Sequence, residues 1–174
     1  MIIQTDRFGE LHVNEDVLIH FPEGILGFES LRKFLLVARE HDSGFAFLQS
    51  AERPDLAFVV TDPLGFRPDY RPILADADRA MLEWDGKAPL QVLVIVTVPE
   101  DVRNTTANLL APVVIHVEKR IGRQVVQENT SYSTRHRIID ELARAQRLIE
   151  PAAASCPVTI VSQANQEALL RRSV

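Results

Sequence analysis

Apolar and polar residues alternate most informatively between Asn108 and Val117, in the second half of the chain. Successive side chains of a strand point to opposite faces, and every odd position from Leu109 to Val117 is apolar. A polar turn, 118–122, then leads into a second run rich in β-branched residues, 123–127. The pattern predicts a β-hairpin with one face buried in a core.

The other face of the outgoing strand is mixed, because its even positions carry both apolar and polar side chains. Pro112 has no N–H group for a ladder hydrogen bond, so we expect it at an edge or a bulge. A face that is half apolar is suited to docking a partner, although the same residues can also simply close the fold. The candidate protein-binding residues on this face are Leu110, Pro112 and Val114.

Short runs with the period of a strand also fill the first hundred residues, with turn residues between them. The run 91–98 is apolar on both faces, which is typical of a central strand covered on both sides. Pro68 and Pro72 make the segment around them irregular. The other predicted strands are 2–3, 11–13, 16–21, 34–38, 45–49 and 56–61.

Two segments show the helical period instead. The first predicted helix covers 76–84, with Asp76 as its N-cap, and the second covers 137–150, where Pro151 ends it. Beyond it, 152–157 is interpreted as a linker, 158–161 as one more strand and 165–172 as a short final helix. The apolar stripes behind the two main helices are Ala77, Ala80, Met81 and Trp84 in the first and Ile138, Leu142, Ala145 and Ile149 in the second.

Strands at close intervals, with turn signals between them and one or two small helices, indicate a mainly β fold. We expect a small antiparallel β-barrel-like domain in residues 1–138. Residues 139–174 are expected to form a helical C-terminal extension. The order of the strands does not follow from these patterns.

Regular structure breaks at 22–29, where two glycines flank a pair of aliphatic residues. Glycine allows backbone conformations that make such a loop constrained. The plainer interpretation is a turn that plugs its own barrel with Phe28, and the alternative is a binding loop. Ile25, Leu26 and Phe28 are therefore a second set of candidate protein-binding residues.

Motifs for catalysis or metal binding are missing from the sequence. None of the five histidines pairs with another at i+2 or i+4, as compact zinc sites usually require. The loop Gly24–Gly27 lacks the spacing and the Lys-Ser/Thr of a phosphate-binding loop, and no Gly-x-Ser-x-Gly elbow is present. Cys156 has no His or Asp placed near it in a known motif. We therefore expect no catalytic residue, no cofactor and no metal.

Composition and charge narrow the class of partner. The 174 residues are 46% apolar and 25% charged, which is ordinary for a globular protein, and the net charge of -5 argues against binding phosphate backbones. Neither a signal peptide nor an apolar run long enough for a membrane helix is found, and the single cysteine fits a reducing compartment. We expect a cytoplasmic protein that binds neither nucleic acid nor membrane directly.

Several separate motifs resemble the FliW family of flagellar assembly factors, and they occur in the right order over residues 1–138. Several motifs in order are far more specific than one short pattern. The segment after about His136 matches no motif of the family, so it is expected to pack as an extra helix, mediate self-association or tune partner choice. The matching segments are 21–29, Phe-Leu-Gln-Ser ending at Ser50, Val98-Pro99, 108–115, 122–126 and 132–136.

The resemblance implies a cytoplasmic protein without enzymatic activity that binds two partners in turn. These partners are flagellin and CsrA, the RNA-binding repressor of flagellin translation, and the two are expected to exclude each other. The level of one partner then sets how much protein is free for the other. An alternative from another class is a small-ligand carrier or enzyme with a pocket lined by histidines and acids, and a third is direct RNA binding.

Overall fold

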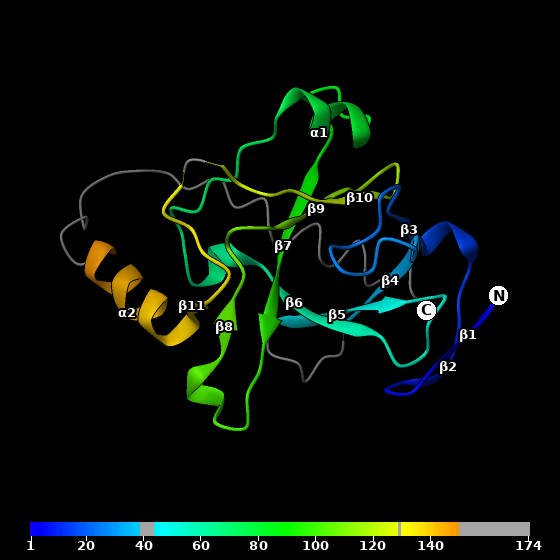
Figure 1. Cartoon of the computed structure of the whole chain (residues 1–174), viewed down its shortest axis with the longest axis horizontal. Coiled ribbons are helices and arrows are strands. Elements are labelled where there is room, and N and C mark those ends of the chain that lie inside the picture. The colour runs from blue at the N-terminus through cyan, green and yellow to red at the C-terminus, as the bar shows by residue number, and fades with distance from the viewer. Residues whose placement is uncertain (39–43, 129, 150–174) are drawn as a thin grey trace.

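The structure is a computed structural model that describes residues 1–38, 44–128 and 130–149, and most of its strands join in one sheet (Figure 1). The strands are β1 (Ile2–Thr5), β2 (Gly9–His12), β3 (Ile19–His20), β4 (Lys33–Val37), β5 (Phe45–Ser50), β6 (Ala57–Thr61), β7 (Leu90–Thr97), β8 (Thr106–Ala107), β9 (Val113–His116), β10 (Ile121–Gln124) and β11 (His136–Arg137). The helices are α1 (Asp76–Met81) and α2 (Ile138–Ile149), with short 3-10 turns η1 (Glu15–Val17), η2 (Pro63–Gly65) and η3 (Val102–Asn104).

The sheet closes into a ring, because β7 pairs with both ends of the strand series. Its order is β7–β6–β5–β4–β3–β10–β9, and β9 then pairs with β7 again. Neighbours in the ring are antiparallel except β3 and β10, which are parallel. The predicted mainly β, barrel-like fold is confirmed, with one parallel pair that the sequence did not indicate.

The main core fills the inside of the ring. The strand β7 is apolar on both faces because each face packs against a different cluster. Leu93 points into the ring and is buried with the barrel core, whereas Val94 and Val96 are buried on the outside beneath Phe66 and Tyr70. The two covered faces predicted for 91–98 are confirmed. The buried barrel core consists of Ile19, Phe21, Ile25, Phe34, Leu48, Val60, Leu93, Val113 and Ile115.

The predicted hairpin is present as β9 and β10, but the expected strand 108–117 is interrupted. Ala107 pairs with Val96 and Val113 pairs with Leu93. Between these two pairs the segment 107–113 advances six residues, whereas β7 advances only three. The extra residues form a bend ahead of Pro112, which lacks the N–H of a ladder residue. The prediction of a bulge at Pro112 is thus confirmed, and the continuous strand is corrected to β8 and β9.

Gly122 lies inside β10 rather than at the end of the turn, where the sequence placed it. A Cβ atom there would collide with the ring of Phe21 in the barrel core, so the position requires glycine for packing. Phe21 in turn stacks edge-on against Phe34 with ring centroids 5.1 Å apart. The turn itself is made by Arg120, whose φ is 56°.

Two other predictions of local structure need correction. The expected strand 16–21 is the 3-10 turn η1 followed by only two residues of β3, because β3 meets its neighbours at Ile19 and His20 alone. The first helix ends at Met81, and Ala77 and Ala80 of its predicted stripe are exposed.

The residues that follow α1, rather than the predicted alanines of the helix, pack against the barrel. The chain turns at Glu83, whose φ is 50°, and it is Leu82 and Trp84 that reach the barrel. Ala75, not Asp76, is the N-cap, and its backbone N–H donates to the Asp78 carboxylate at 2.9 Å.

The N-terminal hairpin β1–β2 and the helix α2 are attached outside the ring (Figure 1). The hairpin covers the outer face of β4, where Ile3 of β1 and Val17 of η1 are buried together with Leu35 of β4. The second predicted helix is confirmed as α2, which follows directly on β11. No helix in the described ranges 1–38, 44–128 and 130–149 is long and apolar enough to cross a membrane. Cys156, the linker 152–157 and the elements predicted at 158–161 and 165–172 lie outside the described residues.

Candidate functional site

The glycine loop, Pro22–Glu29, closes one end of the barrel in a conformation that its glycines require. Gly24 has φ of 72°, and a Cβ atom there would lie 2.6 Å from the carbonyl oxygen of Phe28. Gly27 has φ of 85°, and Ile25 and Phe28 form an isolated antiparallel bridge across the turn. Because such φ values strain any residue with a side chain, the loop is held in one shape.

Ile25, rather than Phe28, plugs the barrel. Its side chain is 1% exposed and belongs to the barrel core. Phe28 is half-buried and packs edge-on against Phe58, with ring centroids 5.4 Å apart. The interpretation of the loop as a plug is therefore correct in kind, with the plugging residue corrected from Phe28 to Ile25.

The side chain of Gln124 joins the glycine loop to the hairpin. Its Oε1 accepts the backbone N–H of Leu26 at 3.1 Å, and its Nε2 donates to the carbonyl oxygen of Ala111 at 3.1 Å. The two sets of candidate binding residues therefore belong to one end of the barrel. Sequence reasoning missed Gln124, although a polar residue two places after Gly122, on the same inward face, is a usable signal.

Ion pairs also connect this end of the barrel to α1. Arg123 donates from Nε to the Asp78 carboxylate at 2.7 Å, and its guanidinium also pairs with Glu23 in the loop. Glu29 accepts the backbone N–H of Gly27 at 2.7 Å, and this hydrogen bond lowers the pKa of Glu29 below its ordinary value. Within the part of the chain that the structure describes, no Lys, Arg or His pairs with Glu29, so this carboxylate is a charged group open to a partner.

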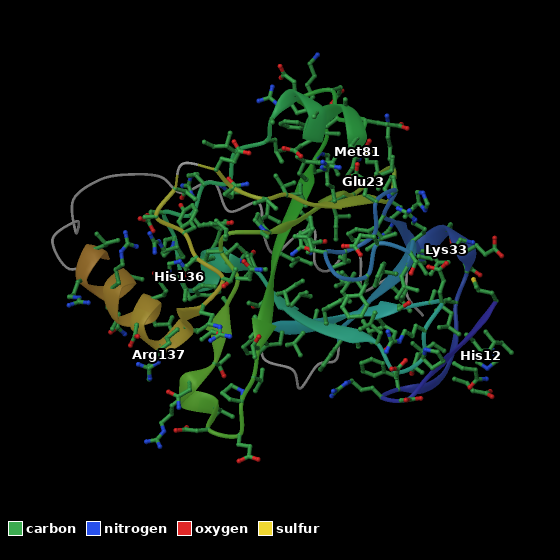
Figure 2. The ribbon with its side chains drawn as sticks, viewed as in Figure 1. His12, Glu23, Lys33, Met81, His136 and Arg137 are labelled. Atoms are coloured by element: carbon green, nitrogen blue, oxygen red, sulfur yellow. The ribbon has the colours of Figure 1, made fainter. Side chains whose placement is uncertain are left out.

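A pocket of about 250 Å³ lies between the loop, β10 and α1. Figure 2 shows Glu23 and Met81, which both line it, at the end of the barrel that carries α1. Leu26 lies at this pocket and is 56% exposed, although its backbone N–H is held by Gln124. The pocket is lined by Pro22, Glu23, Gly24, Leu26, Glu29, Met81, Gly122, Arg123 and Gln124.

The six candidate binding residues differ sharply in how much surface they offer. Leu26 is exposed, and Phe28 and Leu110 are half-buried. Val114 is 1% exposed and packs against Leu82, which follows α1, so the mixed face is covered here by the chain itself. Ile25 and Pro112 are buried as well. A binding role for these residues stays a prediction, and the first three are the ones that a partner reaches without rearrangement.

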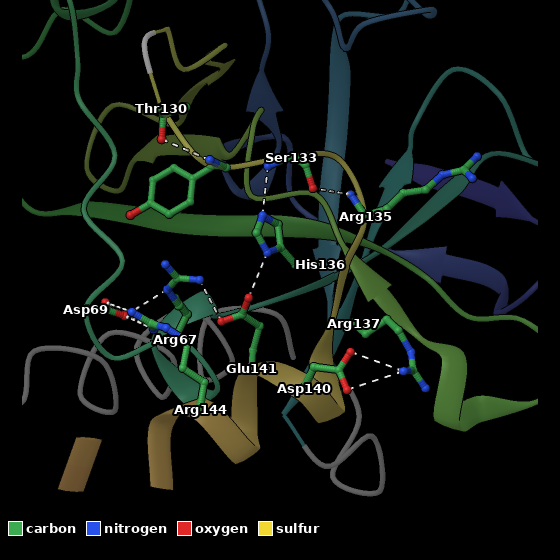
Figure 3. A network of polar contacts seen from close by, with 11 residues as sticks. Arg67, Asp69, Thr130, Ser133, Arg135, His136, Arg137, Asp140, Glu141 and Arg144 are labelled. Atoms are coloured by element: carbon green, nitrogen blue, oxygen red, sulfur yellow. Dashed lines mark hydrogen bonds and ion pairs between the residues drawn. The ribbon is translucent and has the colours of Figure 1, made fainter. Parts of the chain in front are cut away.

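A second polar network fixes α2 to the barrel (Figure 3). Glu141 is 8% exposed; its carboxylate pairs with Arg67 Nη1 at 2.8 Å and with His136 Nδ1 at 2.8 Å. His136 Nε2 accepts the backbone N–H of Ser133 at 2.9 Å, so in the neutral ring Nδ1 carries the proton and donates to Glu141. Every partner of the buried carboxylate is thus a hydrogen-bond donor.

The residues just before β11 also contact the segment that leads into the hairpin. The carbonyl oxygen of Ser133 accepts the backbone N–H groups of Leu109 and Leu110, each at 3.1 Å. The Tyr70 hydroxyl donates to the carbonyl oxygen of Leu109 at 2.7 Å, and burial raises the pKa of Tyr70. The bend ahead of Pro112 is therefore held by backbone and side-chain hydrogen bonds on the α2 side. Among the described residues, no group of three or more His, Cys, Asp or Glu side chains is arranged to hold a metal ion.

Comparison with known proteins gives one consistent result. A family model described as "FliW protein" matches residues 2–138. "Flagellar assembly factor FliW" of Desulfitobacterium hafniense is 42% identical over 141 residues, which cover 81% of this chain and 93% of that protein. The protein of the same name from Bdellovibrio bacteriovorus is 40% identical over 155 residues, or 88% of this chain and 87% of the relative. A crystal structure of the flagellar assembly factor FliW superposes with a TM-score of 0.75 at 38% identity, covering 79% of this chain and 96% of that one.

Proposed function

Because this chain belongs to the FliW family, we propose that it is a flagellar assembly factor that acts in the cytoplasm by binding proteins and catalyses no reaction. The observation that carries the proposal is the match to the family over residues 2–138, which spans the whole barrel. The two relatives cover 81% and 88% of this chain at 42% and 40% identity.

The partners are flagellin and the RNA-binding translational repressor CsrA, bound one at a time. When flagellin is abundant it occupies the protein, and when flagellin is exported the freed protein sequesters CsrA. Flagellin translation is thereby tied to flagellin export. Such a switch needs no conformational change, because mutually exclusive ligands already set each other's free concentration by mass action.

The form of the candidate site supports a protein partner more than a metabolite. The pocket beside Leu26 is about 250 Å³, below the usual range of about 300 to 1,000 Å³ for small-molecule sites. Its volume suits one or two side chains, and its rim carries an exposed apolar residue. The alternative of a small-ligand carrier or enzyme finds no comparable support in the site.

Competition between the two partners tests the proposal directly. Immobilised protein is loaded with CsrA, and flagellin from the same organism is added in steps while bound CsrA is measured. We expect flagellin to release CsrA, and CsrA to release flagellin in the reverse experiment. Simultaneous binding of both partners at saturation would refute the switch, and binding of neither would refute the function.

The net charge of -5 gives the switch a further, electrostatic consequence. An acidic protein docked on CsrA adds a potential that is unfavourable to RNA phosphates. Inhibition of RNA binding by CsrA is therefore expected to weaken as salt rises from 50 to 500 mM, because salt screens exposed charges. Inhibition that does not change with salt would remove the electrostatic part and leave the competition intact.

A further inference from the structure

The pocket between the glycine loop, β10 and α1 combines a fixed apolar rim with an excess of uncommitted negative charge. Leu26 is 56% exposed, yet its backbone N–H is held by Gln124, and the loop around it is restricted by two glycines with positive φ. A side chain presented on a backbone that is already ordered loses little further freedom on binding. This favours a role in recognition over an incidental exposed leucine.

Arg123, the one basic residue among the described residues that line the pocket, is already paired, whereas one of the pocket's carboxylates is not. Arg123 pairs with both Glu23 and Asp78, and the charged Arg32, which lies outside the lining, donates to the carbonyl oxygen of Pro22. Glu29 has no cationic partner in the described ranges, and the hydrogen bond from Gly27 lowers its pKa and so favours its ionised form. An incoming group with positive charge therefore gains an electrostatic partner here, and an incoming carboxylate or phosphate does not.

Apolar contact is available directly beside this charge. Met81 of α1 lines the pocket together with Leu26. Methionine adapts its shape to an inserted apolar group, which suits a surface that must receive a side chain.

We propose that this pocket, which we call the Leu26 pocket, receives an apolar side chain flanked by lysine or arginine from a segment of a partner protein. The inference rests on the proposed function in taking the partner to be a protein, and it adds the chemistry that the partner must present. The apolar side chain lies against Leu26 and Met81, and the basic side chain lies against Glu29.

A peptide titration tests the pocket without either full-length partner. The peptide acetyl-Gly-Lys-Leu-Lys-Gly-amide is added to the full-length, ¹⁵N-labelled protein up to several millimolar, and backbone amide shifts are followed. We expect shifts confined to the loop, β10 and the end of α1. The matched peptides Gly-Glu-Leu-Glu-Gly and Gly-Lys-Ser-Lys-Gly, with the same blocked ends, separate charge from apolar contact, and both are expected to bind about fivefold or more weakly.

Two variants identify the residues responsible. Leu26→Ser removes the apolar contact, and Glu29→Gln removes the charge while keeping an oxygen that accepts the Gly27 N–H. Each is expected to weaken the Lys-Leu-Lys peptide about fivefold. Leu64→Ser and Glu100→Gln change exposed residues that do not line the pocket, so they serve as matched controls with no expected effect.

The outcomes separate this inference from the proposed function. If the Lys-Leu-Lys peptide leaves the pocket amides unshifted, or the Glu-Leu-Glu peptide binds equally well, the pocket chemistry is wrong. If flagellin and CsrA compete as proposed but bind the Leu26→Ser and Glu29→Gln variants as they bind the unaltered protein, the function stands and the pocket is wrong. If the peptide binds at the pocket while neither protein does, the pocket stands and the proposed function fails.

Discussion

The two helices are attached to the same barrel by different proportions of apolar and ionic contacts. The α1 segment is held mainly by apolar packing, with Leu82 fully buried against Val114 and Val125 and Trp84 beside them, and by one ion pair from Asp78 to Arg123. Among the apolar α2 residues whose burial is described, Ala145 is buried and Ile138 is half-buried, and the close contacts of the helix include the ion pairs of Glu141 and Arg144. Apolar burial depends little on pH or salt, whereas ion pairs depend on both. We therefore expect α1 to behave as part of the barrel and α2 as a separately responsive element.

The largest expected effect comes from removing the apolar anchor of the α1 segment. Leu82→Ala leaves a cavity in a fully buried position, so the free energy of unfolding should fall by about 3 kcal/mol. Urea unfolding measures it. Val102→Ala, at a position 67% exposed, is the control and should change stability by less than about 0.5 kcal/mol. Equal effects of the two substitutions would show that the anchor does not hold the segment.

A smaller and more local effect is expected from Glu141→Ala. The substitution leaves Arg67 and His136 without their buried carboxylate, at a cost of about 2 kcal/mol, since Arg67 keeps its second ion pair with Asp69. Hydrogen exchange should show faster exchange of α2 amides while β7 amides stay protected. Glu141→Gln keeps one acceptor oxygen but turns an NH2 donor toward the other donor, so its loss of protection should lie between that of the unaltered protein and that of Glu141→Ala. Equal loss of protection in β7 would mean that α2 is integral to the barrel.

The smallest effect concerns the exposed pair between Arg144 and Asp69, whose two hydrogen bonds measure 2.9 and 2.6 Å. Its partial exposure limits the effect of Arg144→Ala to below about 1 kcal/mol. The hydrogen bond from Arg144 holds the pKa of Asp69 well below its ordinary value of 3.8. A carboxyl whose pKa is lowered by folding stabilises the fold above that ordinary value and ceases to do so as the pH falls through its folded pKa.

The difference in α2 protection between Arg144→Ala and the unaltered protein should therefore shrink as pH falls from 5 to 2. It should also shrink in 1 M NaCl. Arg53→Ala, which removes the exposed pair with Asp55, is the control and should leave α2 protection unchanged at every pH. A difference that grows with acidification would contradict the assignment of the pair.

Local periodicity predicted most strands and the second helix, because alternation and helical stripes report which side of an element is buried. It failed where long-range packing decides the outcome. The stripe through Ala77 and Ala80 suggested their burial, yet the helix is too short to use it and Leu82 packs instead. The parallel pairing of β3 with β10 joins segments about a hundred residues apart, and no local pattern encodes it.

The candidate site was predictable in its segments and not in its arrangement. The glycine loop and the hairpin both stood out in the sequence, but their meeting depends on long-range contacts of the Gln124 and Arg123 side chains. Val114 was expected on an accessible face, and that face is covered by residues that follow α1. Alternation tells which residues share a face of a strand, but it does not tell which distant segment lies on that face.

A closed circle of strands has its backbone hydrogen-bonding groups satisfied from within, so the ring offers little for a visiting chain to extend. Under the proposed function the client is a filament subunit, a protein that assembles with copies of itself. Because the backbone groups of the ring are already hydrogen-bonded, such a client can be bound through loops and side chains alone. It can then be released without a strand of the client having joined the sheet.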